Sequence, residues 1–397
     1  MYAFSITRFV IPVALAAVLA ACQTSQQLNA PVNTAVASLA AAPVLRQDQF
    51  HGIYEISTAA DGLSIFVATV GDGNAQGGGL LHRLDARTLQ TLQTIQTPRR
   101  SYALGLNQAT QTLFVGNTRE GALTVVDAMS GMVKGQIQLA QPSVNDKGVT
   151  TYAHTRKVIV DAQRNRVFVT SPSEPGMVWI VDTASNTLTH TVASEGLWTA
   201  GAAYDSVSNV LYVGQAGQHE VLAIDPDTGR VMRTFSTGDS ADNTGAGAKH
   251  FFVNLALDSK GQRLFATDAN TDQLYVLDLT TGQFVSKVGI EGLGLLDVVY
   301  NPVRNEVITS SRGVSSSQPS GIGVVTILDA RTFAVKQRFD VPVHPNSLAL
   351  SPDGQVLYVT VKSPNAKHPA WRKNNQDSVV RFDLSRVPDG GLSATSR

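Results

Sequence analysis

The stretch WTAGAAYDSVSNVLYVGQAGQHEVLAIDPDTGRVMRTF, residues 198–235, contains four short apolar segments separated by turn residues. The segments are 198–205, 211–215, 220–225 and 231–235, and Asn, Asp, Gly and Pro are frequent between them. Short apolar runs bounded by such residues predict β-strands joined by tight turns. This stretch therefore predicts a sheet of four antiparallel strands.

The third of these segments recurs seven times along the chain. Its copies end in Asp85, Asp127, Asp182, Asp225, Asp278, Asp329 and Asp383, at intervals of 42 to 55 residues. We interpret these aspartates as turn residues rather than catalytic acids. Repeats of this length with several strands predict a β-propeller, and one unit alone cannot bury both faces of its sheet. The predicted fold class is all-β, a seven-bladed β-propeller of four-stranded antiparallel blades.

The seventh blade is short at its end. The strand at residues 379–384 is followed by SRVPDGGLSATSR, which has no strand pattern. A blade without its outer strand would expose an edge and leave the ring open. Residues 43–49, PVLRQDQ, read as a strand, and we expect this N-terminal strand to close the last blade. The alternative is a disordered N-terminal arm.

The N-terminus has the features of a bacterial lipoprotein signal. Arg8 precedes an apolar stretch that ends at Ala21 and is too short to span a bilayer comfortably. The junction Leu19-Ala20-Ala21-Cys22 resembles a lipobox, and Gln23, rather than Asp, follows the cysteine. We expect lipidation of Cys22 and a periplasmic location at the outer membrane. The alternative is a plain cleaved signal with an incidental cysteine.

The predicted organisation follows from these observations. Residues 1–21 form the signal peptide, residues 22–42 the lipidated cysteine and a flexible tether, residues 43–388 the propeller, and residues 389–397 a C-terminal tail. The tether is rich in Ala, Gln, Ser, Thr and Asn and carries no charge, as flexible linkers do. We expect a monomer that contacts the membrane only through its lipid.

Composition excludes several classes of protein. The 397 residues carry 31 basic and 31 acidic side chains, so no bulk charge attracts nucleic acid or membrane. With one cysteine, the chain can form no intrachain disulfide and no C-x-x-C-H haem site. It also lacks a Walker loop, a G-x-S-x-G elbow and an H-E-x-x-H motif. We therefore expect no cofactor, no metal site and no catalytic residues.

Basic and aromatic residues gather on one predicted face. If the strands of each blade are named A to D from the axis outward, the D–A and B–C connections share a face. Our candidate ligand-binding residues there are Arg99, Arg100, Tyr102, Asn117, Arg119, His154, Arg156, Lys157, Trp198, Lys249, His250, Phe251, His344, Asn346 and Trp371. Such residues could pair with phosphates and stack on bases. The alternative is a set of polar groups that only solvate a channel mouth.

Several segments resemble one known family. SPDGQVLYVTV, residues 351–361, resembles the YVTN-type repeat. Residues 116–118, 249–257 (KHFFVNLAL) and 344–350 (HPNSLAL) extend the likeness, so that the chain resembles the YncE-like bacterial periplasmic seven-bladed propellers. The resemblance implies the fold derived above, a periplasmic location, and binding of single-stranded DNA by the face with the D–A connections. It implies no catalytic residues.

Two classes of function follow from the sequence. The first is a non-enzymatic binding or scaffold propeller of the cell envelope, whose ligand is single-stranded DNA or another polyanion, or whose partner is an envelope protein. The second is a propeller enzyme of lactonase or lyase type with its site in the channel mouth. We favour the first, because no residues are spaced as a nucleophile with its base.

Overall fold

The computed structural model describes residues 42–71, 78–194, 196–240 and 247–386. The predicted signal peptide, Cys22, nearly all of the tether and the predicted tail lie outside the described residues. Within these ranges, no helix combines the length and the apolar character that crossing a membrane requires.

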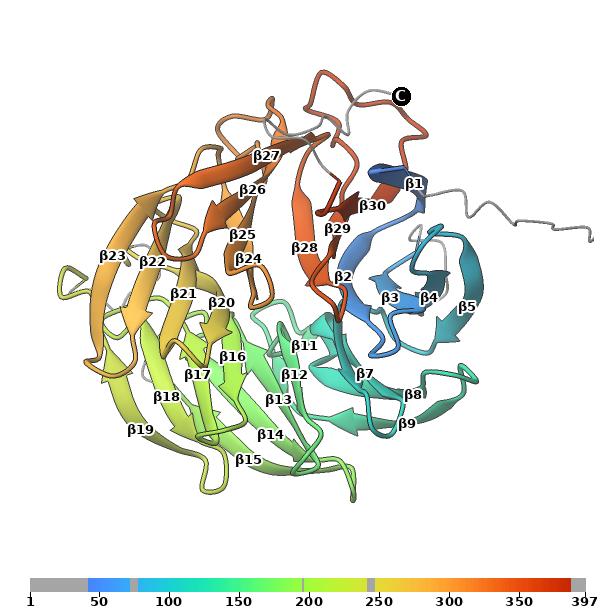
Figure 1. The fold of residues 1–397 in the computed structure, drawn as a ribbon. Coiled ribbons are helices and arrows are strands. Elements are labelled where there is room, and N and C mark those ends of the chain that lie inside the picture. The colour runs from blue at the N-terminus through green and yellow to red at the C-terminus, as the bar shows by residue number, and fades with distance from the viewer. Residues whose placement is uncertain (1–41, 72–77, 195, 241–246, 387–397) are drawn as a thin grey trace, which may run out of the picture. The chain divides into compact units, whose positions relative to one another are not determined.

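Seven four-stranded antiparallel sheets stand around a ring, as Figure 1 shows. The inner A strands are β2 (Ile53–Thr58), β6 (Ala103–Asn107), β12 (Val158–Asp161), β16 (Ala202–Asp205), β20 (Phe252–Asp258), β24 (Leu295–Asn301) and β28 (Pro345–Leu350). The B strands are β3 (Ser64–Thr69), β7 (Thr112–Asn117), β13 (Arg166–Ser171), β17 (Val210–Gly214), β21 (Arg263–Asp268), β25 (Glu306–Ser311) and β29 (Val356–Val361).

The outer half of each blade completes the sheet. The C strands are β4 (Gly79–Asp85), β8 (Ala122–Asp127), β14 (Met177–Asp182), β18 (Val221–Asp225), β22 (Gln273–Asp278), β26 (Gly323–Asp329) and β30 (Asp377–Asp383). The D strands are β5 (Thr91–Thr97), β9 (Val133–Gln138), β15 (Thr187–Ala193), β19 (Arg230–Phe235), β23 (Gln283–Gly289), β27 (Val335–Val341) and, in blade seven, β1 (Val44–Phe50). The predicted fold class is confirmed.

The ring closes through the N-terminal strand. β1 pairs antiparallel with β30, with Val44 opposite Phe382 and Asp48 opposite Ser378, and a bulge places Phe50 opposite Asp377. The next strand, β2, is already the A strand of blade one, so the two ends of the propeller meet in blade seven. The predicted closing strand is therefore confirmed, one residue displaced from its expected bounds.

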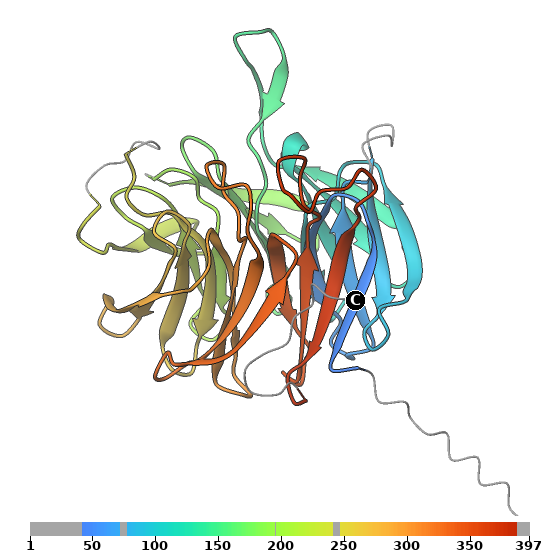
Figure 2. The ribbon, with the colours of Figure 1, turned by 90° about the horizontal axis from the view of Figure 1, so that it is seen from above.

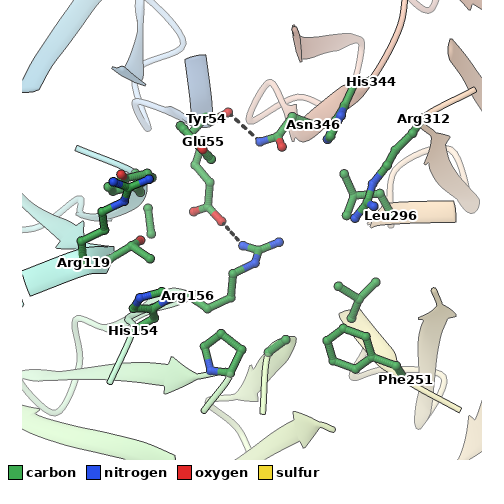
Figure 3. A pocket seen from close by; sticks show the side chains of 16 residues that line it. Tyr54, Glu55, Arg119, His154, Arg156, Phe251, Leu296, Arg312, His344 and Asn346 are labelled. Atoms are coloured by element: carbon green, nitrogen blue, oxygen red, sulfur yellow. Dashed lines mark hydrogen bonds and ion pairs between the residues drawn. The ribbon is translucent and has the colours of Figure 1, made fainter. Parts of the chain in front are cut away.

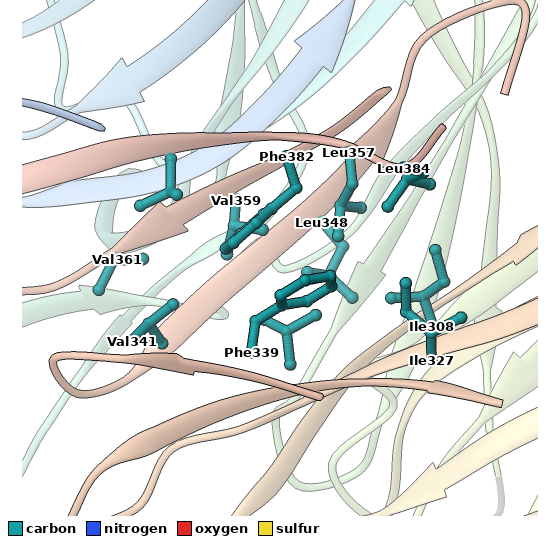
Figure 4. Close-up of a cluster of buried hydrophobic side chains, with 12 residues drawn as sticks. Ile308, Ile327, Phe339, Val341, Leu348, Leu357, Val359, Val361, Phe382 and Leu384 are labelled. Atoms are coloured by element: carbon teal, nitrogen blue, oxygen red, sulfur yellow. The ribbon is translucent and has the colours of Figure 1, made fainter. Parts of the chain in front are cut away.

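Apolar side chains fill the space between neighbouring blades. The B strands β7, β13 and β25 are buried at every position, because blades cover both of their faces. Between blades six and seven, Figure 4 shows Phe339 of β27 stacked on Phe382 of β30, with ring centres 4.4 Å apart. Burying one such side chain stabilises the fold by about 1.5–3 kcal/mol.

The repeated aspartates serve the turns that follow the C strands. In blade three, the N–H and the hydroxyl of Ser185 both donate to Asp182 Oδ1 at 2.7 Å. These hydrogen bonds lower the pKa of Asp182. The same pattern recurs in other blades, as at Asp329 with Thr332. The interpretation of these residues as turn residues is confirmed.

A β-hairpin stands out from one face of the ring. β10 (Pro142–Val144) and β11 (Thr150–Tyr152) form a two-stranded sheet within the D–A connection between blades two and three. Figure 2 shows this hairpin, drawn in green, projecting beyond the blades. The sequence analysis did not predict it, because three-residue strands of polar composition give almost no periodic signal.

Removal of the closing strand should destabilise the whole ring. Deletion of residues 43–49 exposes the edge of β30 and the apolar surface that β1 covers. We expect the free energy of unfolding to fall by at least about 3 kcal/mol, the burial of one or two large side chains. Thermal and urea unfolding measure the change, and deletion of residues 30–36 in the predicted tether is the size-matched control. Equal melting curves for the two deletions would contradict closure by β1.

Candidate functional site

The seven A strands begin at one face of the ring, and the residues there surround a cavity of about 410 Å³. We call this cavity the channel-mouth pocket. Side chains from all seven blades line it, as Figure 3 shows for most of them. The lining residues are Tyr54, Glu55, Tyr102, Ala103, Thr118, Arg119, His154, Arg156, Pro172, Ala200, Phe251, Val253, Leu296, Arg312, His344 and Asn346. A cavity of this volume is large enough for a small molecule or one nucleotide.

Glu55 of β2 is a buried acid at the centre of the pocket. Arg156 donates to Glu55 Oε1 at 2.9 Å, and Lys157 Nζ lies 3.4 Å from the same oxygen. The N–H of Leu104 donates to Oε2 at 3.1 Å. Both carboxylate oxygens are therefore engaged, and the contacts join blades one, two and three across the channel.

Two further guanidinium groups line the pocket without an ion pair. Arg312 follows the last residue of β25, and its Nε is buried without a hydrogen bond in the described structure. Burial lowers the pKa of Arg312, Arg156 lowers it further, and Asp272 opposes them. Arg119 lies in the single turn of 3-10 helix η1 (Thr118–Glu120). Among the described residues, no carboxylate lies within 4.0 Å of either guanidinium group.

Lys362 adds a fifth cation, next to the ring of Tyr54. Its Nζ donates to the carbonyl of Ile53 at 2.5 Å and lies 3.5 Å from the centre of the Tyr54 ring. Burial lowers the pKa of Lys362 to about 8, with Arg156 and Arg312 adding to the effect. Asp377 acts in the opposite direction. The lysine is thus held in a region of positive potential.

His344 lies in the same region of positive potential as Lys362. Burial lowers its pKa to about 3, and Arg312 and Lys362 add to the shift, so the imidazole is neutral at physiological pH. Its backbone is left-handed, with φ of +47°, and Trp198 has φ of +51°. For such bulky residues this conformation costs on the order of 1–2 kcal/mol. Backbone strain of this kind concentrates at binding sites.

An apolar wall lies beside these cations. Ala200, Val253 and Leu296 form a small buried cluster, and Phe251 packs against it. The ring of Trp198 meets that of Phe251 edge to face, with centres 5.6 Å apart. The pocket therefore offers an apolar and aromatic surface next to guanidinium groups, which suits an anion with a flat or apolar body.

The structure brings together about half of the residues that the sequence suggested. Seven of the fifteen line the channel-mouth pocket: Tyr102, Arg119, His154, Arg156, Phe251, His344 and Asn346. Trp198 supports Phe251 from behind, and Lys157 pairs with Glu55. The topology gathers these residues because each stands at the start of an A strand or in the B–C connection beside it.

The other suggested residues lie elsewhere. Arg99 donates to the side chain of Gln138, and buried Asn117 donates to the carbonyl of Arg100. Arg100 does not line the pocket. Trp371 is 41% exposed in the connection between β29 and β30.

Two further suggested residues belong to another cluster, between blades four and five. Lys249 pairs with Asp239 at 2.5 Å. His250 is fully buried between Asp239 and Asp268. The two residues directly precede Phe251, so one connection serves both this cluster and the channel-mouth pocket.

Sequence reasoning missed three residues that shape the pocket: Tyr54, Glu55 and Arg312. Glu55 had a usable signal, because a charged residue between Tyr54 and Ile56 breaks an apolar strand. Arg312 also had a signal, because it follows a B strand and so stands in a B–C connection on the same face, but only the ring shows that it lines the pocket.

Comparisons with known proteins agree with this architecture. No family model matches the chain. The chain is 32% identical over 353 residues to the uncharacterized protein YncE of Salmonella typhi, which covers 89% of this chain and 94% of that protein. It is 31% identical over 345 residues to YncE of Escherichia coli K12, 87% and 92% of the two chains. A human NHL repeat-containing protein 2 is 29% identical over 147 residues, 36% of this chain and 20% of that protein.

The potential of the pocket can be measured at Lys362. We expect this amine to lose its proton near pH 8, well below the ordinary 10.5, because it is buried near Arg156 and Arg312. Replacement Arg312→Gln removes one repelling charge and should raise the pKa of Lys362. ¹³C NMR of reductively methylated protein follows the titration, with Lys362→Arg assigning the signal. Arg331→Gln, in an exposed turn, is the control, and an ordinary pKa for Lys362 would contradict the burial described here.

Proposed function

The chain belongs to the YncE family of propellers, and from this premise we propose that it is a non-enzymatic binding protein of the cell envelope. Its channel-mouth pocket holds an anionic ligand. The observation that carries the proposal is the pair of guanidinium groups, Arg119 and Arg312, that line the pocket without a carboxylate partner in the described part of the chain. The ligand we propose is single-stranded DNA, anchored by one nucleotide in the pocket.

Charge balance supports an anion. Three arginines and one carboxylate line the pocket, and Glu55 already faces two cations, Arg156 and Lys157. Arg119 and Arg312 lie on opposite sides of the pocket (Figure 3), and an anion beside either one would accept charge-assisted hydrogen bonds in a partly buried place, where such bonds are stronger than in water.

The neighbouring surfaces support a nucleotide as the anchored unit. Its phosphate would pair with Arg312, and its base would lie against Phe251 and the wall of Val253 and Leu296 on the same side of the pocket (Figure 3), while Arg119 on the other side would be free for a neighbouring phosphate. Base stacking on aromatic side chains tolerates any base, because every base has a flat π face. Trp371, which is 41% exposed outside the pocket, is available to a neighbouring base of an extended strand.

The same geometry supports binding better than catalysis. Glu55 is the one carboxylate that lines the pocket among the described residues, and both its oxygens accept hydrogen bonds. A general acid or base must instead be free to exchange a proton at the reacting group. The lactonase- or lyase-type alternative would therefore need chemistry that this arrangement of residues does not favour.

A protein partner is the second candidate, and the hairpin of β10 and β11 favours it. Val144 and Val149 are 69% and 54% exposed on this hairpin. Both strands pair only with each other in the described structure, which leaves each with an outer edge. An isolated two-stranded hairpin is marginally stable in water, and open strand edges with apolar side chains suit the addition of a strand from a partner.

Substitution of the two unpaired arginines should weaken DNA binding. We expect Arg312→Gln and Arg119→Gln each to lower the affinity for single-stranded oligonucleotides of any sequence. Each should also reduce the slope of log affinity against log salt by about 0.7, the value for one phosphate contact on a single strand. Phe251→Ala should cost about 1–3 kcal/mol if a base stacks there. Fluorescence anisotropy at several salt concentrations measures both quantities.

Controls separate this site from general basicity. Arg331→Gln removes an arginine from an exposed turn after β26 and should leave affinity and slope unchanged. Duplex DNA and polyphosphate are tested beside the single strand. If either of them binds more tightly than single-stranded DNA, the ligand is not the one proposed. A chain that binds none of these polyanions at low salt would refute the proposed function.

The proposed location depends on Cys22, which lies outside the described residues. We propose that it is lipidated and holds the propeller at the outer membrane, facing the periplasm. Cys22→Ser should remove the acyl mass and abolish membrane fractionation, leaving soluble protein or an uncleaved precursor. Mass spectrometry of the mature N-terminus decides the point. Wild-type protein that is free in the periplasm without acyl chains would contradict the proposal.

A further inference from the structure

A cluster separate from the channel-mouth pocket lies between blades four and five. Glu220 directly precedes β18, Asp239 follows β19, and His250 precedes β20. One ligand atom from each of the three lies within 4.8 Å of the other two. Glu220 and His250 are fully buried, whereas the side chain of Asp239 is 45% exposed. Two members of the group are therefore buried, and the third is open to solvent.

Hydrogen bonds determine which nitrogen of His250 carries a proton. Asp268 Oδ1 accepts from the N–H groups of Phe251 and Asn270, both at 3.0 Å, and Oδ2 accepts from the hydroxyl of Thr271 at 2.7 Å. The carboxyl group of Asp268 thus acts as an acceptor toward all three donors. His250 Nδ1, 2.5 Å from Asp268 Oδ2, must therefore donate to it.

The other nitrogen of His250 faces oxygen atoms. Nε2 lies 2.7 Å from Asp239 Oδ1, and Glu220 completes the group. With Nδ1 donating to Asp268, Nε2 is the nitrogen that faces Asp239. One imidazole nitrogen and two carboxyl groups thus lie together, and each is of a type that can offer an electron pair to a metal ion.

The hydroxyl of Thr237 bridges the two carboxyl groups. Its oxygen lies 2.9 Å from Glu220 Oε1 and 2.7 Å from Asp239 Oδ1, and its one proton can be donated to one of them. The backbone N–H of Thr237 also donates to Glu220 Oε2 at 3.0 Å. Thr237 therefore holds Glu220 and Asp239 side by side, next to His250.

From this geometry we propose that Glu220, Asp239 and His250 bind a divalent transition-metal ion of the Zn²⁺ class. One imidazole and two carboxylates are ligands that Zn²⁺ takes in proteins, with water in the remaining position. The hydrogen bond from His250 Nδ1 to Asp268 is the outer contact that orients metal-binding histidines. Bonds of about 2.0–2.2 Å place neighbouring ligand atoms about 3.4 Å apart, and the exposed Asp239 can move to reach this spacing.

The position of the cluster links it to the pocket. His250 adjoins Phe251, whose N–H is held by Asp268 and whose side chain lines the channel-mouth pocket. The bound ion would fix the D–A connection that presents Phe251. Metal binding is nevertheless independent of the proposed DNA ligand, and either can fail without the other.

Calorimetric titration of the purified full chain with ZnCl₂, after removal of metals with EDTA, tests the site. At pH 7.5 we expect one Zn²⁺ per chain. Asp239→Asn and Glu220→Gln should each weaken binding at least tenfold. Co²⁺ bound in place of Zn²⁺ should give visible d–d absorption bands that Asp239→Asn abolishes. Cys22→Ser serves as the background for every variant, because a free thiol would bind Zn²⁺ as well.

Matched controls distinguish a built site from surface binding. Asp225→Asn removes a carboxylate at the other end of β18, and His219→Gln removes the histidine next to Glu220. Both should leave Zn²⁺ affinity unchanged. Circular dichroism and thermal unfolding confirm that each variant is folded. Absence of stoichiometric binding, or equal affinity in wild type, Asp239→Asn and Glu220→Gln, would overturn the proposal and leave a protonated His250 between two carboxylates.

Discussion

The need to bury both faces of every blade is the constraint on which the rest of this structure depends. A single four-stranded sheet rich in Val, Ile, Leu and Phe would expose apolar faces to water, so each blade packs against its neighbours. The first and last blades must also pack against each other, which closes the ring. The clusters between blades six and seven and between blades seven and one are formed by the same kinds of side chain as the others. What differs is that β1 (Val44–Phe50) comes from the opposite end of the chain.

Closure of the ring also forms the channel-mouth pocket. The seven A strands begin at one face, so the residues at or just before their first positions lie close to the axis. Arg156, Arg312 and Arg119 come from three different blades and line the same pocket. The packing between blades holds Arg156 near Arg312, and burial, with these two charges adding to it, lowers the pKa of Lys362. Stability of the ring therefore maintains like charges near one another at the pocket.

The same connections carry a second kind of chemistry further from the axis. His250 is buried within the group of Asp239, Asp268 and Glu220, while the next residue, Phe251, lines the channel-mouth pocket. One short segment thus contributes to two sites with opposite charge, a cationic pocket at the axis and an acidic group between blades. The blades keep the two groups apart, so that their opposite charges do not cancel.

The sequence by itself determined the elements of the fold. The repeated strands that end in Asp, the turn residues between them and the strand at residues 43–49 predict seven blades and their closure, because strand periodicity and turn chemistry are local properties. The same local pattern, however, gave little sign of the hairpin of β10 and β11. The candidate site was predictable only in part. Position at the start of an A strand identified Tyr102, Arg156 and Phe251, but not which basic residues point to the axis and which point outward.

Only the tertiary structure decided those questions. Arg99 and Arg312 look alike in the sequence, yet one pairs with Gln138 on an outer strand and the other is partly buried at the pocket. Likewise, Glu220, Asp239 and His250 have no metal-site spacing along the chain, and two separate connections, one before β18 and one before β20, bring them together. The physical reason is that charge interactions depend on distance and burial in space. In a ring, residues a hundred positions apart can face one another while immediate neighbours point to different surroundings.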